Sequence, residues 1–151
     1  APVDGQPDAM RDEWSGDIGC GVKYFSQDSV IKLAPAAGIE LDESLSPAEK
    51  LKVVQGLMEQ GDSRAAEIYK SIGVYLAHTL VHYYNLYQYR HVLLLGRVMS
   101  GKGGDLLLDT CKQVLADEYP AVNEKIHLAL PDEKFRRVGQ SAAAASLPEL
   151  K

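Results

Sequence analysis

Residues 93–104, LLLGRVMSGKGG, carry the clearest potential for chemistry in this sequence. Gly96, Gly101 and Lys102 match the spacing of the phosphate-binding pattern G-x-x-x-x-G-K-[ST], in which the final hydroxyl holds Mg²⁺. Gly103 stands where that hydroxyl is required, so the pattern disfavours a phosphate loop. Only one further strand is predicted after the stretch, whereas a phosphate loop follows the first strand of its domain. Two interpretations stay open: a turn where a ligand approaches the backbone before a helix N-terminus, or a plain glycine-rich connection.

Two histidines lie four residues apart on a predicted helix, a spacing that can place both imidazoles on one metal ion. Thr79 follows His78, where the zinc motif H-E-x-x-H has its glutamate, and no third ligand is evident near His82. We interpret the pair as a solvated or interface-facing polar stripe. A tyrosine-rich run follows, which can stack on a base or sugar but more often forms a packed helix end or a protein interface: Tyr83, Tyr84, Tyr87 and Tyr89. No Ser–His–Asp set or carboxylate pair stands out, so no catalytic residue is assigned.

Composition limits the classes of function. The 151 residues are 46% hydrophobic and 25% charged, as in one soluble domain, and the net charge of −5 gives no attraction to nucleic acid or anionic lipid. No apolar run approaches the about 20 residues that cross a bilayer. Cys20 and Cys111 form no metal-binding or disulfide pattern, which favours a cytoplasmic location, although a single disulfide between them stays open.

Because the chain begins at Ala1 rather than Met, it is compatible with being part of a longer protein. Residues 1–25 are predicted to be an irregular segment or linker, followed by one domain over 26–151.

The helices expected before the glycine-rich stretch have clear start signals. Ser46, Pro47 and Glu49 form a capping box with proline at the first helical position. Asp62 caps the longest predicted helix, residues 63–86. Apolar side chains cover most of the circumference of that helix. We therefore expect it to be largely buried, between a sheet and a partner, and we expect a homo-oligomer.

Two strands and two further helices complete the predicted order. Residues 91–95 form a continuous apolar run that is typical of a central strand covered on both faces. A helix over 104–118, a second strand over 125–129 and a final helix over 133–147 follow. This alternation predicts an α/β fold with parallel neighbouring strands. Two strands make a poor sheet, so we expect further strands in residues 1–25 or in chain that precedes this sequence.

Three consecutive blocks resemble the C-terminal part of the ROK family of repressors and sugar kinases. Residues 61–86 are similar to the family's long helix, which begins with Gly-Asp and ends with Asn-Leu. Residues 90–109 are similar to the strand, glycine turn and helix of its adenosine-side motif, close to L-G-G-G-V-S followed by G-x-x-L-L. Residues 136–147, RRVGQSAAAASL, resemble the family's closing helix. The order and spacing agree over more than half of the chain.

The resemblance implies a ribonuclease-H-like, actin-like ATPase fold, of which this chain is the C-terminal lobe with parallel strands covered by helices. It implies that ATP lies beside Gly96, Ser100, Gly101 and Lys102. It also implies an N-terminal lobe of the same parent protein as the partner, an Asp from that lobe as the catalytic base, and a sugar as the substrate. The chain alone is therefore expected to phosphorylate nothing.

The sequence departs from the family at two places. Arg97 and Val98 replace part of the glycine cluster that approaches the nucleotide. The segment IGCGVKYFS resembles the end of the family's structural zinc site, where Cys20 fits but Val22 stands in place of a glutamate. We therefore predict that zinc is absent. The departures favour an alternative hypothesis, a non-catalytic sensor or structural domain of a ROK-like transcriptional regulator.

Overall fold

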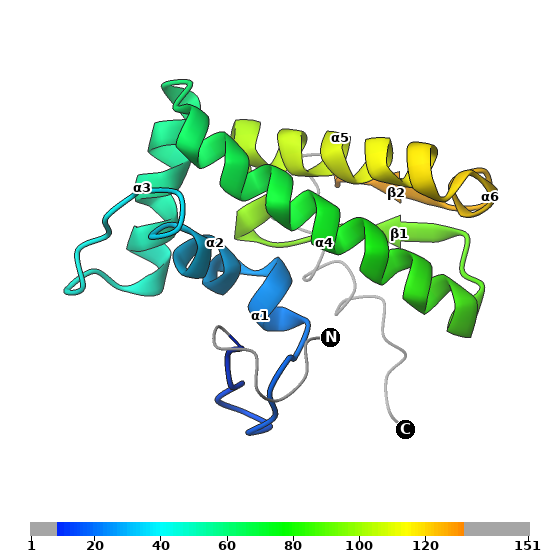
Figure 1. The fold of residues 1–151 in the computed structure, drawn as a ribbon, viewed down its shortest axis with the longest axis horizontal. Helices are drawn as coiled ribbons and strands as arrows, with labels where there is room; N and C mark the ends of the chain where they lie inside the picture. The colour runs from blue at the N-terminus through cyan, green and yellow to red at the C-terminus, as the bar shows by residue number, and fades with distance from the viewer. Residues whose placement is uncertain (1–8, 132–151) are drawn as a thin grey trace, which may run out of the picture.

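Helices dominate the structure, a computed structural model that describes residues 9–131. Figure 1 shows the two longest helices lying side by side, with a small sheet next to them. In chain order the elements are α1 (Val22–Phe25), α2 (Gln27–Leu33), α3 (Pro47–Glu59), α4 (Ser63–Tyr87), β1 (His91–Leu93), the 3₁₀ helix η1 (Arg97–Met99), α5 (Gly101–Glu118), α6 (Pro120–Asn123) and β2 (His127–Ala129). The helix predicted over 133–147 lies outside the described residues.

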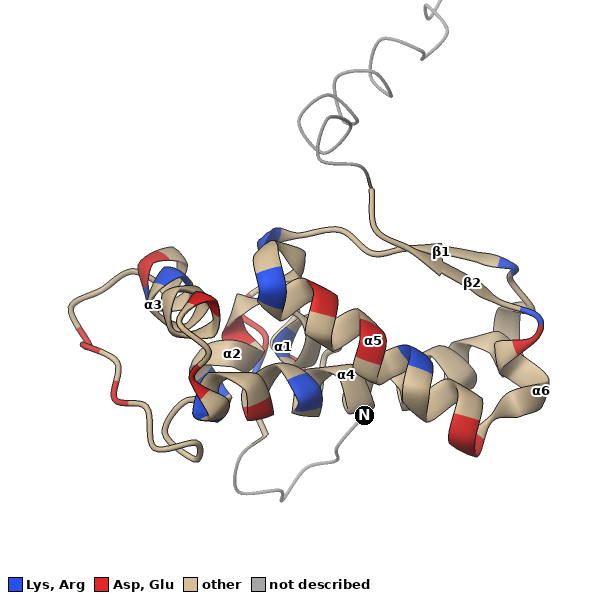
Figure 2. Ribbon diagram, turned by 90° about the horizontal axis from the view of Figure 1, so that it is seen from above, with Lys and Arg blue, Asp and Glu red and all other residues tan. Residues whose placement is uncertain are grey.

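The sheet consists of two parallel strands joined through α5. His91 pairs with His127, Val92 with Leu128, and Leu93 with Ala129. Parallel pairing of these strands, and hence a mixed α/β architecture, confirms the coarse prediction from the sequence. Figure 2 shows both strands on one side of the α4–α5 pair. Among residues 9–25, the only strand-like feature is an isolated antiparallel bridge between Arg11 and Ile18, so the described part of that segment adds no strand to the sheet.

Local capping explains where the long helices begin, as predicted. The Ser46 side chain accepts a hydrogen bond from the Glu49 backbone N–H, and the Glu49 carboxylate accepts one from the Ser46 backbone N–H at 2.9 Å. Asp62 accepts a hydrogen bond from the Arg64 backbone N–H at 2.8 Å. The Arg64 side chain and this N–H lower the pKa of Asp62 to about 2. The carboxylate is therefore charged at neutral pH, as the positive end of the α4 dipole favours.

The core lies between α4 and α5, which approach each other closely. Ile72, Leu107 and Leu115 are almost completely buried there, and burial of each contributes about 1.5–3 kcal/mol. A Cβ on Gly73 would lie 2.7 Å from the Leu107 carbonyl oxygen, so this contact between the helices requires glycine. The predicted burial of α4 is confirmed on the face that packs against α5.

The prediction that β1 is covered on both faces is wrong for the described chain. Val92 and Leu94 pack against the core, whereas Leu93 and Leu95 are 57% and 64% exposed. The last turns of α4 are also open, with Leu86 64% and Tyr87 75% exposed. The physical reason is that an apolar run shows that a strand is hydrophobic but does not specify which elements cover it, and within residues 9–131 no element packs on the second face. No helix in this part of the chain is long and apolar enough to cross a membrane.

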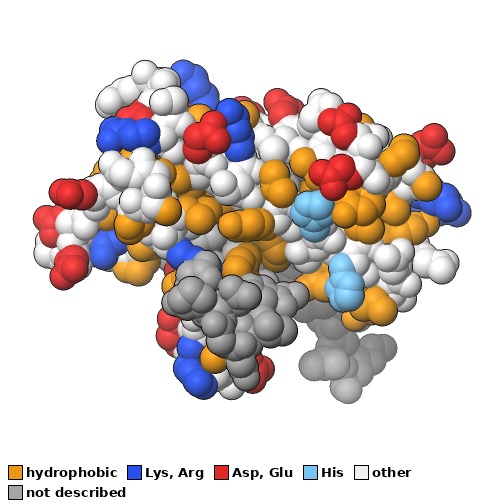
Figure 3. Space-filling model, in the orientation of Figure 1, with side chains coloured by type: hydrophobic (Ala, Val, Ile, Leu, Met, Phe, Trp, Pro, Cys, Tyr) orange, Lys and Arg blue, Asp and Glu red, His pale blue; other side chains and the backbone are white. Residues whose placement is uncertain are grey.

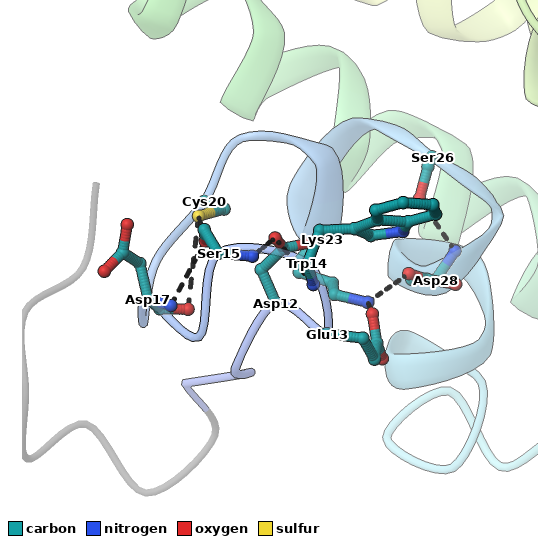
Figure 4. A network of polar contacts seen from close by, with 9 residues as sticks. All are labelled: Asp12, Glu13, Trp14, Ser15, Asp17, Cys20, Lys23, Ser26 and Asp28. Atoms are coloured by element: carbon teal, nitrogen blue, oxygen red, sulfur yellow. Dashed lines mark hydrogen bonds and ion pairs between the residues drawn. The ribbon is translucent and has the colours of Figure 1, made fainter.

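A buried lysine attaches the N-terminal loop to the helices (Figure 4). The Lys23 side chain, 4% exposed, donates to the Asp28 carboxylate at 2.8 Å and also to Glu13. These two hydrogen bonds raise the pKa of the ammonium. Asp12 holds the loop turn itself, because its carboxylate accepts the backbone N–H of Ser15 at 2.8 Å. The loop is therefore fixed to the start of α2, although the sequence shows no periodicity there.

Candidate functional site

Gly96 gives the turn between β1 and η1 its shape. Its φ of 123° and ψ of 163° belong to a region that is essentially restricted to glycine. A Cβ placed on Gly96 would meet no atom within 4 Å. The backbone at Gly96 is therefore open to a ligand, as an adenosine-side turn requires.

A carboxylate from α3 occupies the N-terminal end of α5. The Lys102 backbone N–H donates to Glu59 Oε1 at 3.2 Å, and Lys102 Nζ donates to the Glu59 backbone carbonyl at 3.0 Å. Lys102 Nζ also lies 3.4 Å from Glu59 Oε2. From the same helix, Gln55 Nε2 donates to the Arg97 carbonyl at 2.9 Å. The positive end of α5 and its lysine thus bind an internal anion at the place where a phosphate loop would bind phosphate.

The last two glycines of the stretch serve packing. A Cβ on Gly103 would lie 2.4 Å from the Tyr69 ring, and one on Gly104 would lie 2.2 Å from the Met99 carbonyl oxygen. Both residues are buried, so neither faces a ligand. The two glycines that follow Lys102 are therefore explained by the close packing of α5 on α4 and η1.

The structure brings the four predicted nucleotide-site residues into one turn. Gly96 precedes η1, and Ser100 is the extended N-cap residue of α5. Gly101 has a φ of 68°, and Lys102 contacts Glu59 as described. The open backbone at Gly96 leaves room for a ligand group such as the adenosine part of ATP. Phosphate groups are disfavoured beside Lys102, because Glu59 already accepts the Lys102 hydrogen bonds and would repel them.

Two hollows in the surface lie away from this turn. One, of about 540 Å³, is bordered by α5, α6 and the start of β2, including Asp109, Lys112 and Asn123. The other, of about 600 Å³, lies beside α2 and includes Ile31, Ile39 and Lys50, among others. None of the site residues predicted from the sequence lines either hollow. Each hollow is lined by both polar and apolar side chains, and the first also includes His127.

The remaining sequence candidates take separate places. His78 Nδ1 lies 2.8 Å from the Tyr119 hydroxyl, and the two rings meet edge to face. His82 contacts Tyr83 instead. Both histidines are exposed, as predicted for a solvated or interface-facing stripe. Cys20 and Cys111 are both free thiols, so the disulfide left open by the sequence is not formed.

Sequence reasoning missed a second pair of histidines, His91 and His127. The two residues are 36 positions apart in sequence (127 − 91), yet they are register partners with ring centroids 6.1 Å apart. Only the pairing of the strands brings them together. The available signal was that His91 begins one predicted strand and His127 lies within the other, but the register cannot be read from one sequence.

Comparison with models of protein families, with curated proteins and with solved structures finds no match to this chain. The geometry of the turn therefore carries the functional argument, together with the resemblance described from the sequence.

Proposed function

We propose that this chain is the nucleotide-side lobe of a ROK-type, ATP-dependent sugar kinase. The observation that supports the proposal is the open backbone of Gly96. Gly96 lies after β1 and before α5, and α5 leads to β2, the parallel partner of β1. This order agrees with the actin-like, ribonuclease-H-like lobe that the resemblance implies. In α/β folds, ligands bind at the carboxyl ends of parallel strands, which is where Gly96 follows β1.

In the proposed complex, the adenosine part of ATP approaches Gly96, while the phosphates extend away from α5 toward the other lobe. ATP would supply the transferable phosphoryl group. The contribution of this chain is to bind and orient the nucleoside, because it contains no match to the family's catalytic Asp. It is therefore expected to be inactive alone and to act with the N-terminal lobe of its parent protein, in the cytoplasm.

Replacing Gly96 with alanine tests this proposal. Gly96→Ala should weaken ATP binding at least tenfold, because an L-residue strains the turn and adds a methyl group where adenosine approaches. Binding is measured by NMR: ¹H–¹⁵N correlation spectra of the labelled chain are recorded while ATP or adenosine is added. In the wild type, the amides of Gly96 and Ser100–Lys102 should shift with both ligands.

The matched control is Gly38→Ala, which changes another positive-φ glycine (φ 73°) with open space around it, in a distant turn. It should leave ATP binding within about twofold, because it strains the backbone at a turn away from the proposed site. Unchanged spectra on addition of ATP, or shifts confined to other regions, would contradict the proposal.

One observation favours the alternative, a non-catalytic domain of a ROK-like regulator. The Glu59 carboxylate lies at the start of α5, where its negative charge opposes the binding of nucleotide phosphates. The coding sequence upstream of Ala1 separates the two hypotheses. A D-x-G-x-T phosphate motif with a catalytic Asp supports the kinase, whereas a helix-turn-helix segment supports the regulator.

The proposal includes a homo-oligomer assembled through the exposed face of α4. Residues 71–89 contain no Asp, Glu, Lys or Arg, and several large side chains there are exposed: Tyr75, Tyr83, Leu86 and Tyr87. Figure 3 shows apolar side chains gathered on this face of the molecule. Two copies of a net-negative chain can meet at such a face without repulsion between like charges.

Leu86→Glu should convert the oligomer to a monomer, weakening association at least tenfold because an unpaired charge would be buried. Multi-angle light scattering during size-exclusion chromatography measures the mass. Val53→Glu, which changes an exposed apolar residue of α3 in the same way, should leave the mass unchanged. A monomeric wild type at the highest soluble concentration would refute this part of the proposal.

A further inference from the structure

The open face of the sheet presents two imidazoles side by side. His91 and His127 begin β1 and β2 and are partners in the parallel register. The register is fixed at both ends, because the His127 N–H donates to the Arg90 carbonyl at 2.7 Å and the Leu94 N–H donates to the Ala129 carbonyl at 3.0 Å. The backbone therefore holds the two side chains at one level of the sheet.

Both imidazoles are available to a ligand. His91 and His127 are exposed, whereas the next residue in each strand, Val92 or Leu128, turns toward the core. Alternation along a strand thus places both histidines on the face opposite Val92 and Leu128, and His127 also borders the hollow beside α5. Neither ring has a hydrogen bond or ion pair with any residue in the described range 9–131, and each contacts the other.

The separation of the rings is close to that of two imidazoles on one metal ion. A metal lies about 2 Å from an imidazole nitrogen and hence about 3 Å from the ring centre, so two neighbouring imidazoles on one ion have centroids about 4.5–5 Å apart. The observed centroid distance is 6.1 Å, with the ring planes at 71°. The ring centres would have to approach by about 1 Å for one nitrogen of each ring to reach the same ion, and both side chains are exposed and can rotate.

We propose that His91 and His127 form a binding site for a divalent transition metal on the open face of the sheet. The donor set selects the class of ion: neutral imidazole nitrogens suit Cu²⁺, Ni²⁺ and Zn²⁺, whereas Mg²⁺ and Ca²⁺ require oxygen ligands. In the part of the chain between residues 9 and 131, no group of three or more His, Cys, Asp or Glu side chains can hold a metal. The ion therefore keeps open positions for water or for a donor from another molecule. This site differs from the Cys20 zinc site considered from the sequence, and it does not depend on the proposed kinase function.

The chain contains its own comparison pair. His78 and His82 have the spacing of helical metal ligands, but they contact Tyr119 and Tyr83 respectively, and no ring contact between the two histidines occurs in the described structure. His78 Nδ1 is also within hydrogen-bonding distance of the Tyr119 hydroxyl. The strand pair is thus expected to bind the metal in preference to the helix pair.

The test is isothermal titration of the untagged chain with NiCl₂, with CuCl₂ as a second probe and MgCl₂ as the control ion. We expect one Ni²⁺ per chain and no Mg²⁺ binding. His91→Gln and His127→Gln should each weaken Ni²⁺ binding at least tenfold, because the second imidazole then no longer binds as part of a chelate. His82→Gln should change the affinity less than twofold. All three positions are exposed, so the variants are expected to fold, which far-UV circular dichroism checks.

Three results would overturn the site: no Ni²⁺ binding by the wild type, binding that survives both His91→Gln and His127→Gln, or loss of binding in His82→Gln. Because this titration contains no nucleotide, its outcome is separate from the ATP experiment. A failed ATP titration leaves the metal site standing, and a failed nickel titration leaves the nucleotide turn standing.

Discussion

Gly104→Ala should lower the free energy of unfolding by about 3 kcal/mol or more, the largest effect we expect from deleting or adding a single methyl group. The added Cβ would lie 2.2 Å from the Met99 carbonyl oxygen and 2.3 Å from its carbonyl carbon. These are backbone atoms of η1, which cannot rotate away as a side chain can. Relief of the clash requires α5 to move away from η1, which would open the contacts of α5 with α4 and α3.

The matched control is Gly56→Ala, in the middle of α3. A Cβ on Gly56 would meet no atom within 4 Å, so the substitution is free of clashes. It should stabilise the protein by about 0.5–1 kcal/mol, because alanine has the higher helix propensity. Urea denaturation followed by circular dichroism measures both changes. If Gly104→Ala shifted the midpoint no more than Gly56→Ala does, the close packing of α5 on η1 would be wrong.

The second large effect is unfolding at alkaline pH. Burial raises the pKa of the Cys111 thiol from 9.0 to about 12, and it raises the pKa of the Tyr69 hydroxyl from 10.0 to about 12. In the unfolded chain both groups lose their protons at the ordinary values, whereas the folded protein retains them. Stability is therefore unaffected by these groups below about pH 9 and falls as the pH rises toward 12. Each group should contribute a slope of about 1.4 kcal/mol per pH unit where only its unfolded form has ionised.

Urea denaturation at several values between pH 8 and pH 11 measures this slope. Cys111→Ala and Tyr69→Phe should each make the alkaline loss of stability less steep, whatever their effect at pH 8. Tyr69→Phe also removes a buried hydroxyl that has no hydrogen-bond partner in the described structure, so it should cost little at neutral pH. Cys20→Ala, at a partly exposed cysteine in the N-terminal loop, is the control and should preserve the slope. An equal slope in Cys111→Ala and the wild type would contradict the assigned cause.

The features predicted correctly are those that depend on a few neighbouring residues. The capping box of Ser46 and Glu49 and the cap by Asp62 act within one helical turn, so the starts of α3 and α4 follow from the sequence. Parallel pairing of the strands also follows, since a helix of the length of α5 separates them. These rules need no knowledge of where distant elements lie.

The features that the sequence did not predict depend on contacts between distant elements. Glu59 reaches Lys102 because α3 packs beside the start of α5, and nothing near Glu59 in the sequence indicates that partner. Gly103 packs against the ring of Tyr69 from α4, and nothing near Gly103 in the sequence indicates that contact. The exposure of Leu93 depends on the elements that cover the second face of the sheet, which a hydrophobic run does not specify.

The short ladder between β1 and β2 has a consequence for the order in which the protein folds. The strands can pair only after α5 has formed and docked on α4, because α5 spans most of the chain between them. The core involves α2 and α3 as well as the α4–α5 pair, whereas the ladder is short and exposes Leu93 on one face. We therefore expect the sheet to form last and to open first in local fluctuations, with the fastest amide exchange among the regular elements. The Gly96 turn and the two histidines lie at opposite ends of this ladder. A ligand bound at either place is therefore expected to stabilise the paired strands and to slow their local opening.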